Sequence, residues 1–361
     1  MSTILFTGFP GFLGIELIPR ILARNPEAHV ACLVQSKYAG LARERAQQLA
    51  VIHPELNGRL QMIEGDITQP GLGTAAAEVK AKVTEIFHLA AVYDLSVGRD
   101  FAVRVNVDGT RHMLDFAESC PALRRFQYVS TCYVSGKHPG EFSESDLDVG
   151  QAFNNFYEET KFLAEVEVQK RMCAGLPVSI YRPAVVVGDS TTGATQKYDG
   201  PYFAMQLLLR QPKIALMPVI GEVHKTELNF VPRDFVVNAI AFLSGKANGG
   251  GHVFHLADPK PLTVDQILHE LARVTERKII RVPVPLSLAK ISIKHMPAIE
   301  GLMRIPAETL DYFVHPVRYG TAQTQAALQG SGIRCPRFPE YAGVLVKFMR
   351  AHPEIGSAAM V

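Results

Sequence analysis

Residues 3–14 read TILFTGFPGFLG, where a short apolar run leads into three glycines, Gly8, Gly11 and Gly14. A helical apolar pattern then runs from Phe12 to Arg24, so the stretch predicts a strand at Ile4–Thr7, a tight turn and a helix. Glycine lets the backbone N–H groups at a helix N-terminus approach a pyrophosphate without a Cβ in the way. The stretch therefore predicts a dinucleotide-binding turn that opens a βαβ unit.

The same alternation of strands and helices continues through the first half of the chain. Five further strands are expected, at Val30–Val34, Leu60–Glu64, Glu85–Ala90, Phe126–Ser130 and Val178–Val187. The helical patterns between them are Leu41–Ile52, Ala75–Lys82, Phe101–Glu118 and Phe156–Ala174. A helix at Phe235–Leu243 and a strand at His252–Leu256 predict a later return to the sheet. This order favours an α/β fold with a doubly wound parallel (Rossmann) sheet.

The pattern changes after Gly188, where DSTTGATQKYDGP is rich in Gly, Ser and Thr and marks a loop leaving the sheet. An amphipathic helix is expected at Thr263–Glu276 and a helical segment at Leu286–His295. We expect a dinucleotide-binding domain of residues 1–187 and about 228–258. A smaller, mostly helical substrate-binding domain would comprise residues 188–227 and 259–361.

Composition excludes several classes of function. Of the 361 residues, 47% are hydrophobic and 20% charged, as in ordinary globular proteins, and the net charge of +2 gives no reason to expect a nucleic-acid partner. The cysteines form no CxxC pair and the histidines no HExxH motif, so neither a disulfide framework nor a metal site is expected. The sequence has no run of about 18 apolar residues and no signal-peptide pattern, so we expect a cytoplasmic protein without a transmembrane segment.

A Tyr-Lys pair is the clearest sign of chemistry. Reduction of a carbonyl needs an acid beside the developing oxyanion, and a tyrosine serves when a nearby ammonium lowers its pKa. Tyr and Lys four residues apart share one helix face, and this YxxxK spacing occurs at Tyr157/Lys161 and at Tyr133/Lys137. Gly136 interrupts the second pair and predicts a loop there, whereas a strong helical pattern continues from the first. Tyr157 and Lys161 are therefore the candidate catalytic pair.

These motifs together resemble a known family. The turn TGFPGFLG looks like that of the extended short-chain dehydrogenases/reductases, and its Phe-Leu-Gly ending is especially similar to the fatty acyl-CoA reductase (male-sterility) and thioester-reductase branch. The resemblance covers roughly residues 3–260. It implies that Thr131 in YVSTCYVSG is the third catalytic group, with Ser130 beside it, and that Lys161 holds the nicotinamide ribose. Either hydroxyl could instead only satisfy the end of a strand.

The resemblance also implies a set of cofactor contacts. The expected contacts are Gly8, Gly11, Phe12, Leu13, Gly14, Gln35, Lys37, Asp66, Ile67, Ala90, Ala91, Asn106, Tyr157, Lys161, Pro183 and Val185. After the second strand, LVQSKY has no acidic residue for a ribose 2′-hydroxyl but has Lys37 for a 2′-phosphate, which favours NADPH over NADH. The branch usually has Arg where Gln35 stands, and Lys37 could be a plain surface lysine. Asp66 could equally cap a turn, and Arg182 is expected either near the nicotinamide or in a structural role.

The resemblance implies an NADPH-dependent reductase of a fatty-acyl-type thioester, bound to CoA or to a carrier, that yields an aldehyde or an alcohol. One alternative is an NAD(P)-dependent ketone or alcohol oxidoreductase of a lipophilic substrate, similar to the hydroxysteroid dehydrogenases, because the same three side chains serve both reactions. Another is a non-catalytic NADPH-binding sensor, which the presence of Tyr157 and Lys161 disfavours. The expected partner is a small acyl or carbonyl substrate; an acyl carrier protein and a homodimer are both compatible with the sequence.

Overall fold

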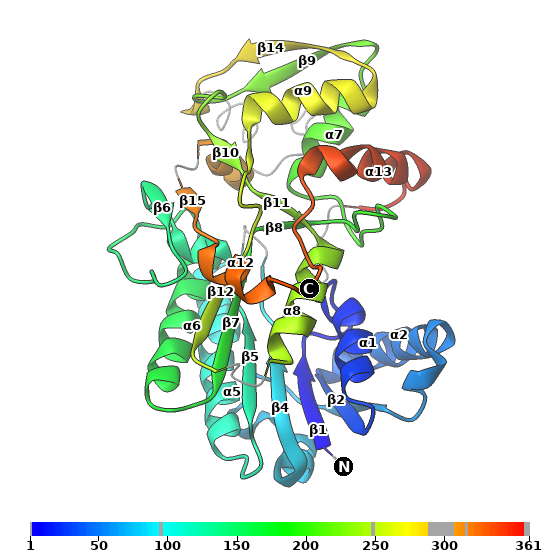
Figure 1. Cartoon of the computed structure of the whole chain (residues 1–361), viewed down its shortest axis with the longest axis vertical. Helices are drawn as coiled ribbons and strands as arrows, with labels where there is room; N and C mark the ends of the chain where they lie inside the picture. Colours follow the sequence, from blue (N-terminus) through cyan, green and yellow to red (C-terminus); the bar gives the residue numbers. More distant parts are fainter. Residues whose placement is uncertain (1, 94–96, 247–249, 288–306, 315–316, 357–361) are drawn as a thin grey trace.

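Seven parallel strands form the central sheet of the computed structural model, which describes residues 2–93, 97–246, 250–287, 307–314 and 317–356 (Figure 1). The strands, in their order across the sheet, are β12 (His252–Leu256), β7 (Val178–Pro183), β5 (Arg125–Val129), β4 (Val83–His88), β1 (Ser2–Thr7), β2 (Ala28–Val34) and β3 (Leu60–Glu64). The order reverses between β1 and β4, and open α/β sheets bind their ligands at such a switch point. The predicted fold class is confirmed, including the return of the chain to the sheet at β12.

Helices cover both faces of the sheet, and the strand residues show why. Ile4 and Phe6 of β1 belong to one buried cluster with helices α1 (Gly14–Arg24) and α8 (Arg233–Ser244). Leu5 belongs to a second cluster with helices α5 (Gly109–Glu118) and α6 (Phe156–Cys173). Successive side chains of a strand point to opposite faces, so a strand covered on both sides reads as a nearly continuous apolar run. This explains the apolar runs from which the strands were predicted.

Most helices around the sheet follow the predicted alternation, and α12 (Ala322–Leu328) was not predicted. Those around the sheet are α1 (Gly14–Arg24), α2 (Ala39–Ile52), α3 (Thr74–Val79), α4 (Arg99–Ala102), α5 (Gly109–Glu118), α6 (Phe156–Cys173), α8 (Arg233–Ser244) and α12 (Ala322–Leu328). No helix in the described part of the chain combines the length and apolar character of a membrane span.

Several boundaries differ from the prediction. Helix α1 begins at Gly14 instead of Phe12, because the residues before it close a turn in which the Gly11 N–H donates to the Gly8 carbonyl oxygen at 2.8 Å. The strand predicted at residues 178–187 is two strands, because β8 (Val185–Val187) leaves the sheet and pairs with β11 (Phe230–Pro232). The helix predicted at 101–118 contains a π-helical stretch, Val103–Asp108, between α4 and α5.

A smaller group of elements lies beyond the carboxyl ends of the strands, in the upper part of Figure 1. It contains α7 (Pro201–Leu209), α9 (Val264–Thr275), α13 (Phe338–Ala351) and the strand pairs β9 (Ile214–Val219) with β14 (Lys278–Pro283) and β10 (Glu227–Leu228) with β13 (Leu262–Thr263). A further pair, β6 (Gly140–Phe142) with β15 (Val317–Tyr319), lies lower in the molecule. Of the helical segment predicted at 286–295, the part from residue 288 onward lies outside the described residues.

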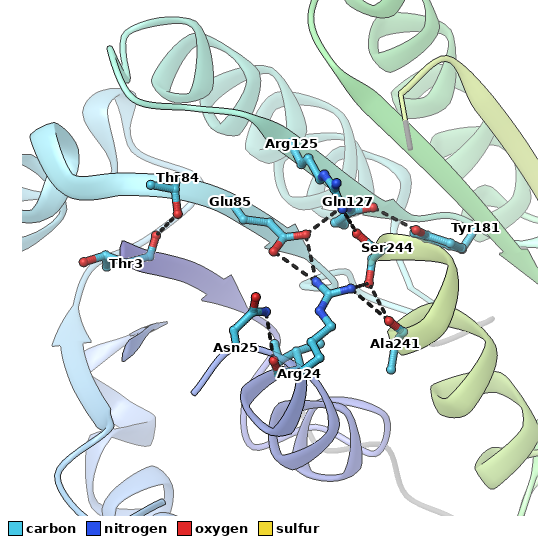
Figure 2. A network of polar contacts seen from close by, with 11 residues as sticks. Thr3, Arg24, Asn25, Thr84, Glu85, Arg125, Gln127, Tyr181, Ala241 and Ser244 are labelled. Carbon is cyan, nitrogen blue, oxygen red and sulfur yellow. Dashed lines mark hydrogen bonds and ion pairs between the residues drawn. The ribbon is translucent and has the colours of Figure 1, made fainter. Parts of the chain in front are cut away.

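A polar network joins the carboxyl ends of helices α1 and α8 to strands of the central sheet (Figure 2). At the end of α1, Arg24 donates to both carboxylate oxygens of Glu85 on β4 at 3.1 Å and to Ser244 Oγ on α8 at 2.6 Å. Gln127 Nε2 donates to Glu85 at 2.9 Å and its Oε1 accepts from the Tyr181 hydroxyl at 2.8 Å. Burial raises the pKa of Glu85 although Arg24 opposes this. The network fixes the far ends of α1 and α8 against three strands.

Candidate active site

The glycine turn leaves no room for side chains. Gly8 has φ of +89°, and a Cβ there would lie 2.9 Å from the Cβ of Leu89. A Cβ on Gly11 or Gly14 would lie 2.7 or 2.8 Å from the Gly8 carbonyl oxygen. Leu13 is the N-cap of α1, and no side chain caps that helix end. The turn therefore presents bare backbone N–H groups at a helix N-terminus, which is the arrangement that a pyrophosphate requires.

Three residues predicted to contact the adenosine half of the cofactor lie together beyond β2 and β3. Burial acts to raise the pKa of Asp66, but hydrogen bonds from Thr68 and Gln35 and the charge of Lys37 outweigh it and lower the pKa. The Lys37 ammonium also lies 4.7 Å from the centroid of the Tyr38 ring. The Thr68 N–H donates to Asp66 Oδ1 at 2.8 Å, so the carboxylate does cap a turn. The structure thus gathers Gln35, Lys37 and Asp66 at one end of the sheet.

The predicted contacts around β4 have clear structural partners. The Ala90 N–H donates to Thr7 Oγ1 at 3.1 Å, and Ala91 follows it in the same loop. The buried amide of Asn106 accepts from the Val92 N–H at 2.8 Å and donates to the Val92 carbonyl at 2.9 Å and to Thr160 Oγ1 at 3.0 Å. Asn106 therefore fastens the loop after β4 to helix α6, beside Lys161.

Ile67 is also fixed by its neighbours. Its side chain is buried against Gly109, where an added Cβ would lie 2.9 Å from Ile67 Cδ1. The ring of His112 is hydrogen-bonded through Nδ1 to the Ile67 carbonyl oxygen at 2.8 Å. Ile67 therefore joins the loop after β3 to helix α5.

Thr131 and Tyr157 come together at the carboxyl end of β5, close enough for the Thr131 side chain to affect the pKa of the tyrosine. Thr131 lies just past β5, and its Oγ1 accepts from the Tyr133 N–H at 3.2 Å. Tyr157 is in the first turn of α6, which Asn155 caps by accepting from the Glu158 N–H at 3.0 Å. Burial raises the pKa of Tyr157 to about 12, against the opposing effect of the Thr131 side chain. The tyrosine is therefore protonated at neutral pH and can donate a proton.

Lys161 lies one helical turn farther along α6. Its Nζ donates to the Tyr128 hydroxyl oxygen at 3.0 Å and to the Val129 carbonyl oxygen at 2.9 Å. Burial lowers the pKa of Lys161 to about 8. The ammonium thus lies beside β5 and remains charged at neutral pH.

A chain of buried hydroxyls continues from Lys161 to the end of β1. The Thr7 Oγ1 accepts from two N–H groups, so its own proton goes to His88 Nδ1 at 2.8 Å. His88 then carries its proton on Nε2, 3.1 Å from Thr110 Oγ1, and the Thr110 hydroxyl donates to the Asn106 carbonyl oxygen at 2.6 Å. The Thr110 side chain also lies close enough to Tyr128 to affect its pKa. Burial lowers the pKa of His88 to about 3, so the ring stays neutral. Nothing in the sequence distinguished His88, Thr110 or Tyr128 from core residues.

Arg182 lies in a second buried network behind the site. Its side chain and that of Glu165 are fully buried and form an ion pair at 2.6 Å. Glu165 also accepts from the Ser130 hydroxyl at 2.5 Å, and Arg182 Nη1 lies 3.0 Å from His255 Nε2. Of the two interpretations of Arg182, these contacts favour the structural one. Pro183 follows it, and the Pro183 carbonyl oxygen lies 3.5 Å from Thr131 Oγ1, while Val185 begins β8.

The second YxxxK motif does not form a helical pair. A short 3₁₀-helix, Cys132–Ser135, holds Tyr133 and ends before Gly136, which has φ of +49°. Tyr133 packs edge to face on Tyr312, with ring centroids 4.7 Å apart. Lys137 follows the glycine and lies outside any helix, as the sequence predicted. The described residues contain no group of three or more His, Cys, Asp or Glu side chains that could hold a metal ion.

Comparison with known proteins agrees with the geometry. The model of the male sterility protein family, a NAD-binding domain family, matches residues 6–240. The chain belongs to the male sterility protein family. This confirms the resemblance to that branch of the extended short-chain dehydrogenases/reductases and the expectation of an NAD(P)-dependent oxidoreductase of this type. The roles of individual site residues in this family member stay predictions.

Several curated relatives are much longer than this chain. Glycine betaine reductase ATRR of Emericella nidulans is 30% identical over 287 residues, which cover 75% of this chain and 22% of that protein. A linear gramicidin synthase polypeptide of Brevibacillus parabrevis is 30% identical over 290 residues, 75% of this chain and 6% of that protein. Fatty acyl-CoA reductase wat of Drosophila melanogaster is 25% identical over 275 residues, 66% of this chain and 53% of that protein.

Solved structures share the fold across almost the whole chain. The terminal R domain from the myxalamid PKS-NRPS biosynthetic pathway has a TM-score of 0.81 at 24% identity, covering 98% of this chain and 92% of that chain. A thiolation-reductase di-domain from an archaeal non-ribosomal peptide synthetase has a TM-score of 0.72 at 20% identity, covering 98% and 91%. At these identities the likeness is one of fold.

Proposed function

We propose that the protein is an NADPH-dependent reductase of a fatty-acyl-type thioester, bound to CoA or to a carrier protein, that releases an aldehyde or an alcohol. The observation that carries this proposal is the placement of Thr131 beside a protonated, partly buried Tyr157 at the carboxyl end of β5. Lys161 lies one turn away on the same helix, beside the strand ends that adjoin the glycine turn. Relatives named as a fatty acyl-CoA reductase and as a linear gramicidin synthase support a thioester as the substrate.

The cofactor fits the turn because a Cβ at Gly8, Gly11 or Gly14 would collide with backbone or side-chain atoms. NADPH is favoured because Gln35 and Lys37 lie together and the segment LVQSKY holds no carboxylate. Bound nicotinamide would supply hydride for the thioester carbonyl carbon. We also propose the division into a dinucleotide-binding part and a substrate-binding part at the boundaries predicted from the sequence.

The side chains of the protein supply the remaining chemistry. The hydroxyls of Tyr157 and Thr131 would donate hydrogen bonds to the oxyanion that develops on the substrate, and Tyr157 would give it a proton. The Lys161 ammonium would hold the cofactor ribose and favour the tyrosinate left behind. When the hemithioacetal collapses, the C–S bond breaks, the sulfur takes a proton and leaves as a thiol, and the aldehyde is released. A second hydride would reduce that aldehyde to an alcohol.

Release of free thiol together with loss of NADPH tests this function. Acyl-CoA and carrier-bound acyl thioesters of graded chain length would be supplied, with Tyr157→Phe and Thr131→Val as the catalytic variants. Lys137→Met is the matched control, because that lysine belongs to the YxxxK motif outside the helix. Thiol release that falls sharply in both catalytic variants and persists in the control supports the proposal. Ketone reduction without thiol release would replace it with the alternative oxidoreductase, and NADPH binding without any turnover with the sensor.

A further inference from the structure

Helices α1 and α8 run side by side in the same direction. Near their amino ends, Arg233 Nη2 on α8 lies 3.2 Å from Glu16 Oε1 on α1, and at their carboxyl ends Arg24 on α1 donates to Ser244 Oγ on α8 at 2.6 Å. Both amino ends therefore lie at the carboxyl edge of the sheet, beside the glycine turn (Figure 1). The polar network in Figure 2 holds the other ends in place.

Both of these helix ends lack a side-chain cap. The N-cap of α1 is Leu13 and that of α8 is Pro232, and neither side chain can accept a hydrogen bond from the first turn. The first N–H groups of a helix carry partial positive charge, so two such ends side by side attract an anion more strongly than one.

The side chain of Arg233 adds a full positive charge beside the amino ends of α1 and α8. The residue is 8% exposed, and its guanidinium carbon lies 5.0 Å from the centroid of the Phe12 ring in the glycine turn. Its Nε is buried and has no hydrogen-bond partner among the described residues. A buried N–H of a charged group without an acceptor is costly, so this N–H is available to a ligand acceptor at the turn.

The nearby carboxylates do not neutralise this arginine. Glu16 is shared, because Arg20 Nη1 also donates to its other oxygen at 3.0 Å. Asp234, the next residue on α8, accepts from the Ser190 N–H at 2.8 Å and from the Ser190 hydroxyl at 2.7 Å. Arg233 therefore keeps donors for an anion at the turn.

We propose that Arg233 is a further cofactor ligand, whose guanidinium binds the pyrophosphate of NADPH together with the backbone N–H groups of the glycine turn and the paired amino ends of α1 and α8. A guanidinium suits a phosphate group because its planar donors match two oxygens at once. The inference rests on the proposed function in that it assumes a bound nicotinamide dinucleotide. It does not depend on the choice between NADPH and NADH, because both contain the pyrophosphate.

The test compares Arg233→Gln with Arg20→Gln in the full-length protein. Both variants remove one guanidinium from Glu16, but Arg20 lies a turn farther along α1, where it also donates to Asn238 Oδ1 at 2.7 Å. NADPH binding would be measured by fluorescence titration, without any acyl substrate. Arg233→Gln is expected to weaken it by about ten- to hundredfold, as expected for loss of a hydrogen bond to a charged group. Arg20→Gln is expected to change it by less than about twofold, because the hydrogen bonds of that side chain go to Glu16 and Asn238.

A second ligand separates binding of the pyrophosphate from damage to the fold. Adenosine 2′-monophosphate lacks the pyrophosphate, so Arg233→Gln should leave its affinity unchanged. Arg233→Lys should bind NADPH with intermediate affinity, because it keeps the charge and loses the fork of donors. Equal NADPH affinity in Arg233→Gln and the unsubstituted protein, or equal weakening of both ligands, would overturn the inference. If NADPH binding weakens in Arg233→Gln but the unsubstituted protein reduces no thioester, only the proposed function would be overturned.

Discussion

Tyr128→Phe isolates the contact that holds the candidate catalytic lysine. The substitution removes the hydroxyl oxygen that accepts from Lys161 Nζ at 3.0 Å and leaves the Val129 carbonyl oxygen at 2.9 Å as its acceptor. The phenylalanine ring would keep the packing under the ammonium, which lies 4.5 Å from the centroid of the Tyr128 ring. A hydrogen bond from a charged donor contributes about 1.5–3 kcal/mol, and about 1.4 kcal/mol corresponds to one pKa unit. The pKa of Lys161 should therefore fall from about 8 by about one to two units.

The sign of the pH effect follows from the charge of the ammonium. A lower pKa means that Lys161 loses its proton at lower pH, so the alkaline limb of the rate profile should move toward acid by about one to two pH units. Initial rates of thioester-dependent NADPH oxidation across the pH range measure this shift. Tyr181→Phe is the matched control, since that buried hydroxyl donates to Gln127 at 2.8 Å in the network of Figure 2. A folded Tyr128→Phe enzyme whose alkaline limb coincides with that of the unsubstituted enzyme would refute the reasoning.

Three further outcomes are expected. Glu165→Gln leaves the buried Arg182 without its carboxylate and should lower the free energy of unfolding by about 3–5 kcal/mol. Glu159→Gln, which breaks a surface ion pair with Arg99, should lower it by less than about 1 kcal/mol. Equal losses of unfolding free energy for the two variants in denaturant titrations would contradict this. Burial lowers the pKa of His88 from 6.5 to about 3, so the unfolded chain binds the extra proton and stability should fall as the pH drops through that interval, by up to about 1.4 kcal/mol per pH unit. Denaturant titrations of His88→Gln should show a shallower fall, and an equally steep one would be evidence against the assignment. Lys161→Met should abolish turnover without lowering the melting temperature in calorimetry. The reason is that burial of the ammonium destabilises the folded protein, as its lowered pKa indicates, and methionine removes this charge. A clearly lower melting temperature would contradict this reasoning.

The sheet could be predicted from the sequence because its central strands are buried on both faces and read as apolar runs. Short strands outside the sheet could not be predicted. β9 and β14 pair in parallel from Ile214↔Lys278 to Val219↔Pro283, although a long stretch of chain separates them. The break between β7 and β8 was equally hidden, because the apolar residues continue from Pro183 to Val187 without interruption. Only the pairing with Phe230–Pro232 shows that β8 has left the sheet.

The candidate catalytic residues could be predicted because their spacing is local. Tyr157 and Lys161 lie one helical turn apart, and Thr131 follows the end of a recognisable strand. The residues around the catalytic pair could not be predicted in this way, because their proximity depends on how the strands pair in the sheet. His88 and Tyr128 are directly opposite each other on β4 and β5, and only this pairing brings both to Thr110. Arg233 likewise reaches the glycine turn only because α8 packs along α1.

The network behind the candidate site bears on the two-part division predicted from the sequence. Arg182 and Glu165 lie between β7 and α6, and His255 on β12 continues the chain of contacts by donating from Nδ1 to the Gly320 carbonyl oxygen at 2.6 Å. Glu144 accepts from the His255 N–H at 3.1 Å and from the Thr324 N–H at 2.9 Å. A buried ion pair stabilises a fold only when its remaining hydrogen bonds are made, and here some of these come from residues beyond 258. The dinucleotide-binding part therefore depends on the last segments of the chain to complete the polar core behind Thr131 and Tyr157.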